Sequence, residues 1–292
     1  MKESFLKYLR YEKRVSPNTL LAYQTDLQQF EDFLHQTFPE ATITHADYGT
    51  IRAWIIHLVD QKQQATSVNR KIACLRSFYK FLRIREVIAN DPMARVKVLK
   101  ARKKLPVFAL EKDMVSALDS KTFNHSFEGI RNQLIIELLY GTGIRLSELI
   151  HLKETQVDRK NCLIKVLGKR NKERIIPFPE NIVSLIEEYR HLRNQVVERM
   201  PHDLLFVTSK GTPCYPMMIN RIVKAYLKDA ALDKRSPHVL RHTYATHLLD
   251  KGAEINALKD LLGHSSLAAT QVYTHNSLEK LKKVFDQAHP KA

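Results

Sequence analysis

Residues 134–148 read LIIELLYGTGIRLSE, and this stretch decides how the second part of the chain folds. The run 134–140, which is apolar except for Glu137, predicts a buried helix. The Gly-Thr-Gly triplet after it predicts the tight turn that ends this helix, and a new helix is expected beyond the turn. Such a turn brings backbone N–H groups and the guanidinium group of Arg145 together, which favours the binding of an anion.

Beyond this turn, the chain is predicted to be helical with one β-hairpin. Two β-branched runs, 163–166 and 174–177, flank a polar turn with Lys169 at its tip, and this pattern predicts the hairpin. Further helices are expected at about 182–197, 217–228, 237–249, 255–262 and 278–286.

Helical periodicity also runs through the first hundred residues. The sequence SPN at 16–18 is a helix start, and apolar residues follow it at helical spacing. Two more apolar stripes lie at 51–58 and 72–82. We therefore expect a helical domain over 1–92 and a basic linker over 93–108 that can lie along a phosphate backbone.

The expected fold class is mainly α. Residues 109–292 should form a second domain, which is mixed but mostly helical and contains the small hairpin or sheet. A chain of 292 residues is long enough for two such domains with separate cores.

The chain carries a large surplus of positive charge. It contains 47 Lys and Arg against 31 Asp and Glu, a formal net charge of +16. Residues 1–104 hold 19 basic and 10 acidic residues, and the remainder holds 28 and 21. A surplus of this size favours a polyanionic partner, because each neutralised phosphate releases counterions. A nucleic acid is preferred, although composition alone does not separate DNA, RNA and an anionic membrane.

The cysteines and the apolar runs indicate the compartment. Cys74, Cys162 and Cys214 are far apart and form no Cys-x-x-Cys motif, so neither a disulfide framework nor a zinc site is expected. The N-terminus lacks the pattern of a signal peptide, and the apolar run near residue 134 is too short to span a bilayer. We expect a soluble, cytoplasmic protein with no membrane partner.

Five further residues join Arg145 as candidates for chemistry. Lys169, at the hairpin tip, could donate a proton or enter a DNA groove. His238 and Arg241 follow a predicted helix start, and their i, i+3 spacing puts both on one face near the helix N-terminus. His264 follows the glycine that ends a predicted helix, and Tyr273 comes nine residues later.

Taken singly, each candidate has a commoner structural explanation. Loop lysines are usually solvated, helical histidines are usually structural, and most tyrosines are packed or exposed without reacting. The order of the six along the chain, Arg, Lys, His-x-x-Arg, His and Tyr, gives them their weight.

This order resembles that of the tyrosine recombinases of the phage integrase family. The stretches GIRLSEL (143–149), GKRNKER (168–174), PHVLRH (237–242), LGHS (262–265) and TQVYTH (270–275) are similar to the motifs of the family. The resemblance spans nearly the whole chain and is closest to the Xer-type bacterial recombinases. It implies that residues 1–92 are a DNA-binding core-binding domain and that residues 109–292 are the catalytic domain.

The resemblance implies a site-specific recombinase that cleaves and rejoins DNA through a 3′-phosphotyrosyl link to Tyr273. Arg145 and Arg241 would brace the non-bridging phosphate oxygens, and Lys169 would protonate the leaving 5′-oxygen.

The other residues of the motifs have supporting parts. His238 would act as general base or phosphate ligand, His264 would hydrogen-bond the phosphate, and Glu148 would orient Arg145 or His238. No metal and no other cofactor is expected, because cationic side chains supply the charge that two metal ions supply elsewhere. Basic residues expected to contact DNA are Arg70, Lys71, Arg76, Lys80, Lys103 and Lys104.

The resemblance also implies partners. Double-stranded DNA would be gripped by a clamp of the two domains. Four protomers, of this chain alone or with a second recombinase, would assemble on two DNA sites. A septal DNA translocase would control the reaction if it resolves chromosome dimers. Residues 277–285 would dock on a neighbouring protomer through an apolar stripe that includes Phe285, or else pack on their own domain.

Three alternatives stay open. The chain could be the integrase of a mobile element, although it starts almost directly with the core-binding helices, which favours the Xer type. It could be a DNA-binding protein without catalysis on the same fold, which the complete set of six residues disfavours. It could also relax DNA as type IB topoisomerases do.

Overall fold

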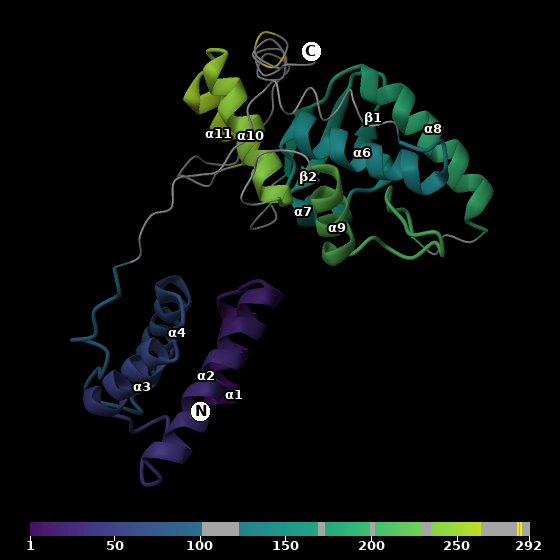
Figure 1. The fold of residues 1–292 in the computed structure, drawn as a ribbon. Coiled ribbons are helices and arrows are strands. Elements are labelled where there is room, and N and C mark those ends of the chain that lie inside the picture. Colours follow the sequence, from purple (N-terminus) through teal and green to yellow (C-terminus); the bar gives the residue numbers. More distant parts are fainter. Residues whose placement is uncertain are drawn as a thin grey trace. The chain divides into compact units, whose positions relative to one another are not determined.

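The computed structural model describes residues 1–100, 123–168, 173–198, 202–228 and 235–263, together with residues 285 and 287. The chain divides into two compact units, Met1–Lys104 and Leu105–Ala292. Figure 1 shows that the first unit is built of helices, whereas the second combines helices with a small sheet. The expected mainly α fold class, with a small sheet in the second part, is confirmed.

The helices of the first unit start where their capping residues allow. Its elements are α1 (Lys2–Lys7), a π-helical turn (Tyr8–Glu12), α2 (Pro17–Thr37), α3 (Tyr48–Asp60) and α4 (Ala65–Ile84). The hydroxyl of Ser16 accepts a hydrogen bond from the amide of Thr19 at 3.2 Å, and the carboxylate of Asp47 accepts one from the amide of Thr50 at 2.8 Å. Both side chains satisfy N–H groups that the first helical turn leaves unpaired.

Aromatic side chains fill the core of the first unit. The Phe30 and Trp54 rings lie 4.8 Å apart between α2 and α3, and the Phe5 ring meets that of Phe78 edge-on at 5.3 Å. The sequence did not predict α1, yet its Phe5 is fully buried and Leu9 of the next turn is nearly so. The N-terminal helix is therefore part of this core.

The expected linker begins inside the first unit. Met93 and Val96 are buried in its core. The Asn69 amide group donates to the Leu99 carbonyl at 2.9 Å and accepts from the Leu99 amide at 2.8 Å. Residues 93–100 therefore pack on the helices, which corrects the expectation that the linker starts at residue 93.

The second unit surrounds one apolar helix. Its elements are α6 (Phe127–Thr142), α7 (Leu146–Ile150), a 3-10 turn (Glu154–Gln156), β1 (Val157–Asp158), β2 (Leu163–Leu167), β3 (Glu173–Pro177), α8 (Asn181–Val196), α9 (Pro216–Tyr226), α10 (Pro237–Asp250) and α11 (Ile255–Leu262). Helix α6 contains the apolar run 134–140, and α8 and α10 pack against it. Nearly all of its side chains from residue 134 onward are buried, which explains why it lacks a polar stripe.

The predicted hairpin is confirmed. Strands β2 and β3 are antiparallel, in a register that runs from Leu163 opposite Pro177 to Leu167 opposite Glu173. The short strand β1, which was not predicted, pairs with β2 to complete a three-stranded sheet. Two residues are too few for an alternating pattern to show in the sequence.

Phe285 packs in its own unit. Its side chain is 2% exposed and belongs to the core of the second unit. Of the two expectations for residues 277–285, the position of Phe285 agrees with packing on the same domain. Residues 277–284 lie outside the described part of the chain. Among the described residues, no helix combines the length and apolar character needed to cross a membrane.

Candidate active site

The end of α6 presents Arg145. Gly143 has φ of +58° and ends the helix in a left-handed conformation, which glycine adopts without strain. The chain then turns so that Arg145 is the N-cap residue of α7. The Arg145 amide and guanidinium group donate to the two carboxylate oxygens of Glu148 at 2.8 and 2.9 Å. The guanidinium group, rather than a free helix N-terminus, is therefore what this turn offers to an anion.

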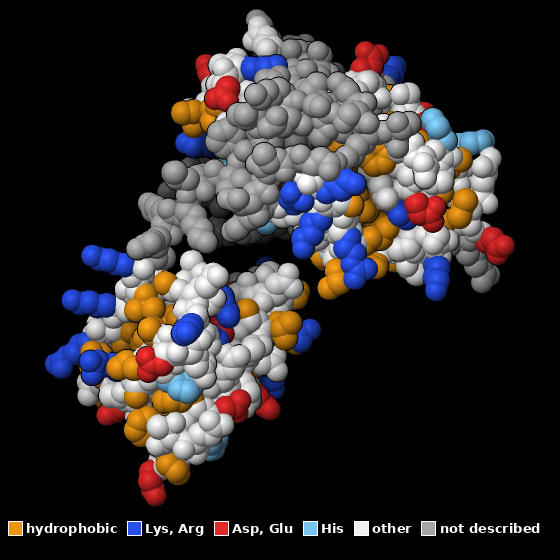
Figure 2. All heavy atoms as spheres, viewed as in Figure 1, with side chains coloured by type: hydrophobic (Ala, Val, Ile, Leu, Met, Phe, Trp, Pro, Cys, Tyr) orange, Lys and Arg blue, Asp and Glu red, His pale blue; other side chains and the backbone are white. Residues whose placement is uncertain are grey.

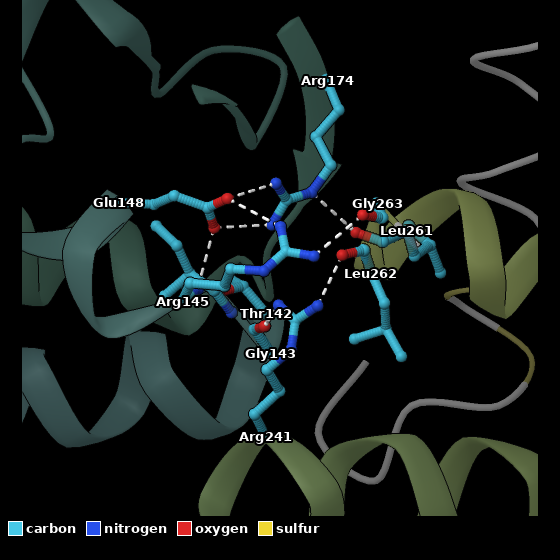
Figure 3. Close-up of polar contacts among 10 residues, drawn as sticks. Thr142, Gly143, Arg145, Glu148, Arg174, Arg241, Leu261, Leu262 and Gly263 are labelled. Carbon is cyan, nitrogen blue, oxygen red and sulfur yellow. Dashed lines mark hydrogen bonds and ion pairs between the residues drawn. The ribbon is translucent and has the colours of Figure 1, made fainter. Parts of the chain in front are cut away.

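Arg241 reaches the same place from α10. Its guanidinium group donates to the carbonyl oxygens of Gly143 and Leu262, and the side chain is only 9% exposed. Figure 3 shows Arg145 and Arg241 side by side, although they come from distant parts of the sequence. The sequence predicted that both would serve one site, and the structure brings them together.

A third arginine, which was not predicted from the sequence, joins Arg145 and Arg241. Arg174 on β3 donates to both oxygens of Glu148, at 2.6 and 2.7 Å, in a two-pronged ion pair. Its Nε donates to the carbonyl of Leu261 at 2.9 Å. We call Arg145, Arg174, Arg241 and Glu148 the arginine cluster. The strand pattern could have identified Arg174, because it lies two residues before Ile176 and therefore on the same, inward face of β3. A charge on that face needs a partner.

The C-terminal end of α11 is held by all three arginines. Arg174 binds the carbonyl of Leu261, Arg241 that of Leu262, and Arg145 that of Gly263 at 2.8 Å. The last carbonyl groups of a helix have no partners within it and carry its negative dipole end. The guanidinium groups here donate hydrogen bonds to these carbonyl groups and place positive charge at the negative end of the dipole. Gly263 ends α11 as predicted, with φ of +61°.

The electrostatics favour a cationic cluster at neutral pH. Burial alone would raise the pKa of Glu148, but the hydrogen bonds and charge of Arg174 and the hydrogen bonds of Arg145 outweigh it and lower the pKa to about 2. Burial, helped by the nearby charges of Arg145 and Arg174, lowers the pKa of Arg241 to about 10. One carboxylate therefore faces three protonated guanidinium groups, and the surplus charge is available to a phosphate.

His238 lies on the first turn of α10. Pro237 occupies the first helical position, as predicted, whereas the side chain of the N-cap residue Ser236 makes no capping hydrogen bond. His238 is exposed and precedes the buried Arg241 by one helical turn. The imidazole is therefore open to a ligand at the surface of the site.

The other three candidates, Lys169, His264 and Tyr273, lie outside the described residues. For Lys169 and His264, the nearest described residues can be named. Glu173 and Gly168 are the described residues that flank the turn of Lys169, and His264 directly follows Gly263, whose carbonyl is bound by Arg145.

Two family models match this chain. Residues 109–280 match the model described as "Phage integrase family", and residues 3–86 match "Phage integrase, N-terminal SAM-like domain". The chain belongs to the phage integrase family. The resemblance read from the sequence is thereby confirmed.

Curated relatives agree over almost the full length. The chain is 35% identical to "Tyrosine recombinase XerC" of Chlorobaculum parvum, with 99% of this chain and 94% of the relative covered. It is also 35% identical to "Tyrosine recombinase XerD" of Staphylococcus haemolyticus, with 99% and 98% covered. This phage integrase family member is therefore a tyrosine recombinase by relationship.

Solved structures share the fold. The Tn1549 transposon integrase in complex with transposon right end DNA aligns with a TM-score of 0.72 at 21% identity, covering 97% of this chain and 98% of that one. The XerH site-specific recombinase, in a post-cleavage complex with palindromic difH substrate, aligns with a TM-score of 0.73 at 20% identity, covering 97% and 83%.

The SAM-like domain requires one correction among the expected DNA contacts. Lys71 is 4% exposed, and its ammonium group donates to Asp26 at 3.1 Å and also to Gln29. Asp26 is fully buried and also pairs with the guanidinium group of Arg70, whose side chain is 44% exposed. Lys71 therefore neutralises a buried carboxylate instead of facing a phosphate, and we no longer count it as a DNA contact.

The other expected contacts of this domain lie at the surface. Arg76 and Lys80 are exposed on α4, and Arg76 also donates to the carbonyl of Val96. Figure 2 shows several Lys and Arg side chains projecting along one side of the unit. Lys103 and Lys104 lie outside the described residues. Arg76 and Lys80 thus remain predicted DNA contacts, together with the partly exposed Arg70.

Proposed function

We propose that this tyrosine recombinase is a site-specific DNA recombinase of the Xer type, acting in the cytoplasm to resolve chromosome or plasmid dimers. One observation carries the proposal. Arg145 and Arg241, distant in sequence, converge on the end of α11 immediately before His264. The names of relatives that are 35% identical over nearly the whole chain support it.

The proposed reaction conserves the number of phosphodiester bonds. The Tyr273 phenolate attacks the scissile phosphorus, the bond to the 5′-oxygen breaks, and Lys169 gives that oxygen a proton. Arg145 and Arg241 stabilise the charge that grows on the non-bridging oxygens. The 5′-hydroxyl of another strand then attacks the 3′-phosphotyrosine and gives its proton to Lys169. The bond from phosphorus to the tyrosine oxygen breaks, and Tyr273 recovers its proton from the base. No ATP is consumed, since the phosphotyrosine retains the bond energy.

The remaining residues assist this exchange. We assign His238 as the base that takes the tyrosine proton, or as a phosphate ligand, and His264 as a hydrogen-bond donor to the phosphate. Glu148 holds Arg145 by two hydrogen bonds. The cationic side chains supply charge that metal ions supply in other phosphoryl-transfer enzymes, so we propose chemistry without a metal or other cofactor.

The assembly follows from the same proposal. Double-stranded DNA is the substrate, and four protomers bring two sites together, either as copies of this chain or with a related recombinase. A septal DNA translocase is the proposed regulator. The basic surfaces of both units are what would hold the DNA backbone.

The proposal is tested by capturing the covalent intermediate. The protein is incubated with nicked genomic fragments of its own organism, denatured in detergent, and the linked DNA ends are sequenced, with Tyr273→Phe in parallel. We expect adducts for the wild type only, clustered at one chromosomal or plasmid site. Clustering at the ends of a mobile element would instead indicate an integrase. Absence of adducts, even with a related recombinase added, would refute the catalytic proposal.

A further inference from the structure

Arg174 joins three elements of the second unit. It lies on β3, pairs with Glu148 on α7 and donates a hydrogen bond to the Leu261 carbonyl at the end of α11. At 4% exposure the side chain does not reach the solvent where DNA would bind. Any effect of Arg174 on the reaction must therefore pass through the groups that it holds.

The packing around Arg174 is close on the α11 side. A Cβ atom added to Gly263 would lie 3.0 Å from Cδ of Arg174 and 3.3 Å from its Nε. The left-handed backbone of Gly263 also favours glycine. The end of α11 and the Arg174 side chain are thus fitted to each other, and the next residue in the sequence is His264.

On the other side, Glu148 depends on Arg174. The Glu148 side chain is 3% exposed, and its carboxylate accepts hydrogen bonds from Arg174 and Arg145. A buried carboxylate that loses a partner is strongly destabilised. Without the two hydrogen bonds from Arg174, the Glu148 carboxylate could shift, and Arg145 would no longer have an acceptor in a fixed position.

We propose that Arg174 is a positioning residue of the recombinase active site. It fixes Glu148, and through Glu148 the phosphate-binding Arg145, while it also fixes the end of α11 that precedes His264. Arg174 lies opposite Val166 in the hairpin, one residue pair before the turn that carries Lys169. The proposal rests on the proposed function, because it assigns Arg145 to the phosphate.

The geometry requires arginine rather than lysine. The planar guanidinium group sends two parallel N–H bonds to Glu148 and a third to Leu261 from fixed positions. A lysine ammonium is a compact charge on a flexible stem and cannot reproduce this fork. Arg174→Lys therefore keeps the charge but loses the positioning.

Arg193 provides a matched control. It is 3% exposed, pairs with Glu154 and donates to the Leu205 carbonyl at 3.3 Å, but it lies on α8 and contacts no member of the arginine cluster among the described residues. Arg193→Lys makes the same chemical change in a similar buried setting. A loss of activity that follows only from lower stability should appear in both variants.

The main experiment measures single-turnover cleavage of a nicked duplex that carries the captured site. With saturating protein, Arg174→Lys should cleave about 10-fold to 100-fold more slowly than wild type, since a small misplacement of a catalytic group has an effect of this size. Its dissociation constant for the same duplex should stay within about twofold. Arg193→Lys should cleave at the wild-type rate.

The pH dependence of the cleavage rate distinguishes a positioning role of Arg174 from a general loss of stability. The charged groups around Glu148 are Arg145 at the start of its own helix, Arg174 on β3 and Arg241 on α10. In Arg174→Met burial should raise the pKa of Glu148, so the pH profile of cleavage should gain an acid limb in addition to those of wild type. The limb should vanish in the double variant with Glu148→Gln.

A measurement without DNA completes the test. Hydrogen exchange of the Arg145 amide, which donates to Glu148, and of residues 255–263 should quicken in Arg174→Lys but not in Arg193→Lys. If wild type cleaves, and Arg174→Lys shows the same cleavage rate and the same hydrogen exchange as wild type, the positioning role is overturned. Failure of wild type to cleave would overturn the proposed function instead, and exchange would still report whether Arg174 holds Arg145.

Discussion

Replacing Gly143 by alanine perturbs the turn that presents Arg145 in two separable ways. The residue has φ of +58°, so a side chain there is strained whatever the space around it. The added Cβ would also lie 2.5 Å from Cδ1 and 2.9 Å from Cε1 of Tyr244. Tyr244 is 1% exposed and belongs to the core of the second unit, where side chains are closely packed.

The magnitude follows from these two effects. A left-handed backbone costs a residue other than glycine about 1–2 kcal/mol, and overpacking of a filled core costs roughly 1–3 kcal/mol. We expect Gly143→Ala to lower the free energy of unfolding of the second unit by about 3 kcal/mol. Gly252→Ala is the control, because φ there is +86° but a Cβ would meet no described atom within 4 Å. It should cost only about 1 kcal/mol.

Buried cysteines allow each unit to be followed separately. Cys74 lies in the core of the first unit and Cys214 in that of the second. Thiol labelling against urea, read by mass spectrometry, gives a midpoint for each. With a slope of about 2 kcal/mol per molar urea, Gly143→Ala should lower the Cys214 midpoint by about 1.5 M and leave that of Cys74 unchanged. Equal shifts in Gly143→Ala and Gly252→Ala would refute the described packing on Tyr244.

Four further outcomes are expected. Folding lowers the pKa of Glu148 from 4.5 to about 2, so the ionised carboxylate stabilises the second unit above about pH 4.5 and this stabilisation is lost as the pH falls toward 2. In a plot of unfolding free energy against pH, Glu148→Gln should therefore flatten the curve between about pH 4.5 and pH 2. Asp26→Ala leaves the buried Lys71 without its carboxylate and should destabilise the first unit by about 3–5 kcal/mol, seen by fluorescence of the single tryptophan, and no loss would contradict the buried pair. Lys80→Ala should reduce the slope of log affinity for DNA against log salt by about 1, and an unchanged slope would remove Lys80 from the DNA contacts. Arg241→Ala should abolish cleavage while retaining much of the DNA affinity, whereas parallel losses would make Arg241 a mere anchor.

The sequence predicted most elements because their periodicity is local. Helix α2 begins after Ser16, as its capping pattern indicated, and the hairpin strands lie where β-branched runs flank a polar turn. Helix α1 was missed because six residues give too short a pattern, although Phe5 and Leu9 are spaced one turn apart. Local signals thus sufficed where a cap, an apolar stripe or a flanking turn marked the element, and failed for α1 and β1, which carry no such mark.

The site was predicted only in part, because partners distant in sequence cannot be read from spacing. Arg145 and Arg241 were identified by their motifs, but the fork between Arg174 and Glu148 depends on how the sheet packs on α7. The prediction for Lys71 was wrong because its partner Asp26 is also distant in the sequence. Its neighbours on α4 include exposed basic residues, yet it lies four residues before Leu75 on the buried face, where Asp26 from α2 neutralises it.

The central claim, covalent catalysis by Tyr273, is tested most directly by mapping the linkage. Detergent-denatured adducts are digested with nuclease and protease, and the modified peptide is sequenced by mass spectrometry, while the free DNA end is tested for direct labelling by a polynucleotide kinase. The account predicts a nucleotide joined through its 3′-phosphate to Tyr273 and a free 5′-hydroxyl that labels without phosphatase. A link to another residue, or through a 5′-phosphate, would contradict it.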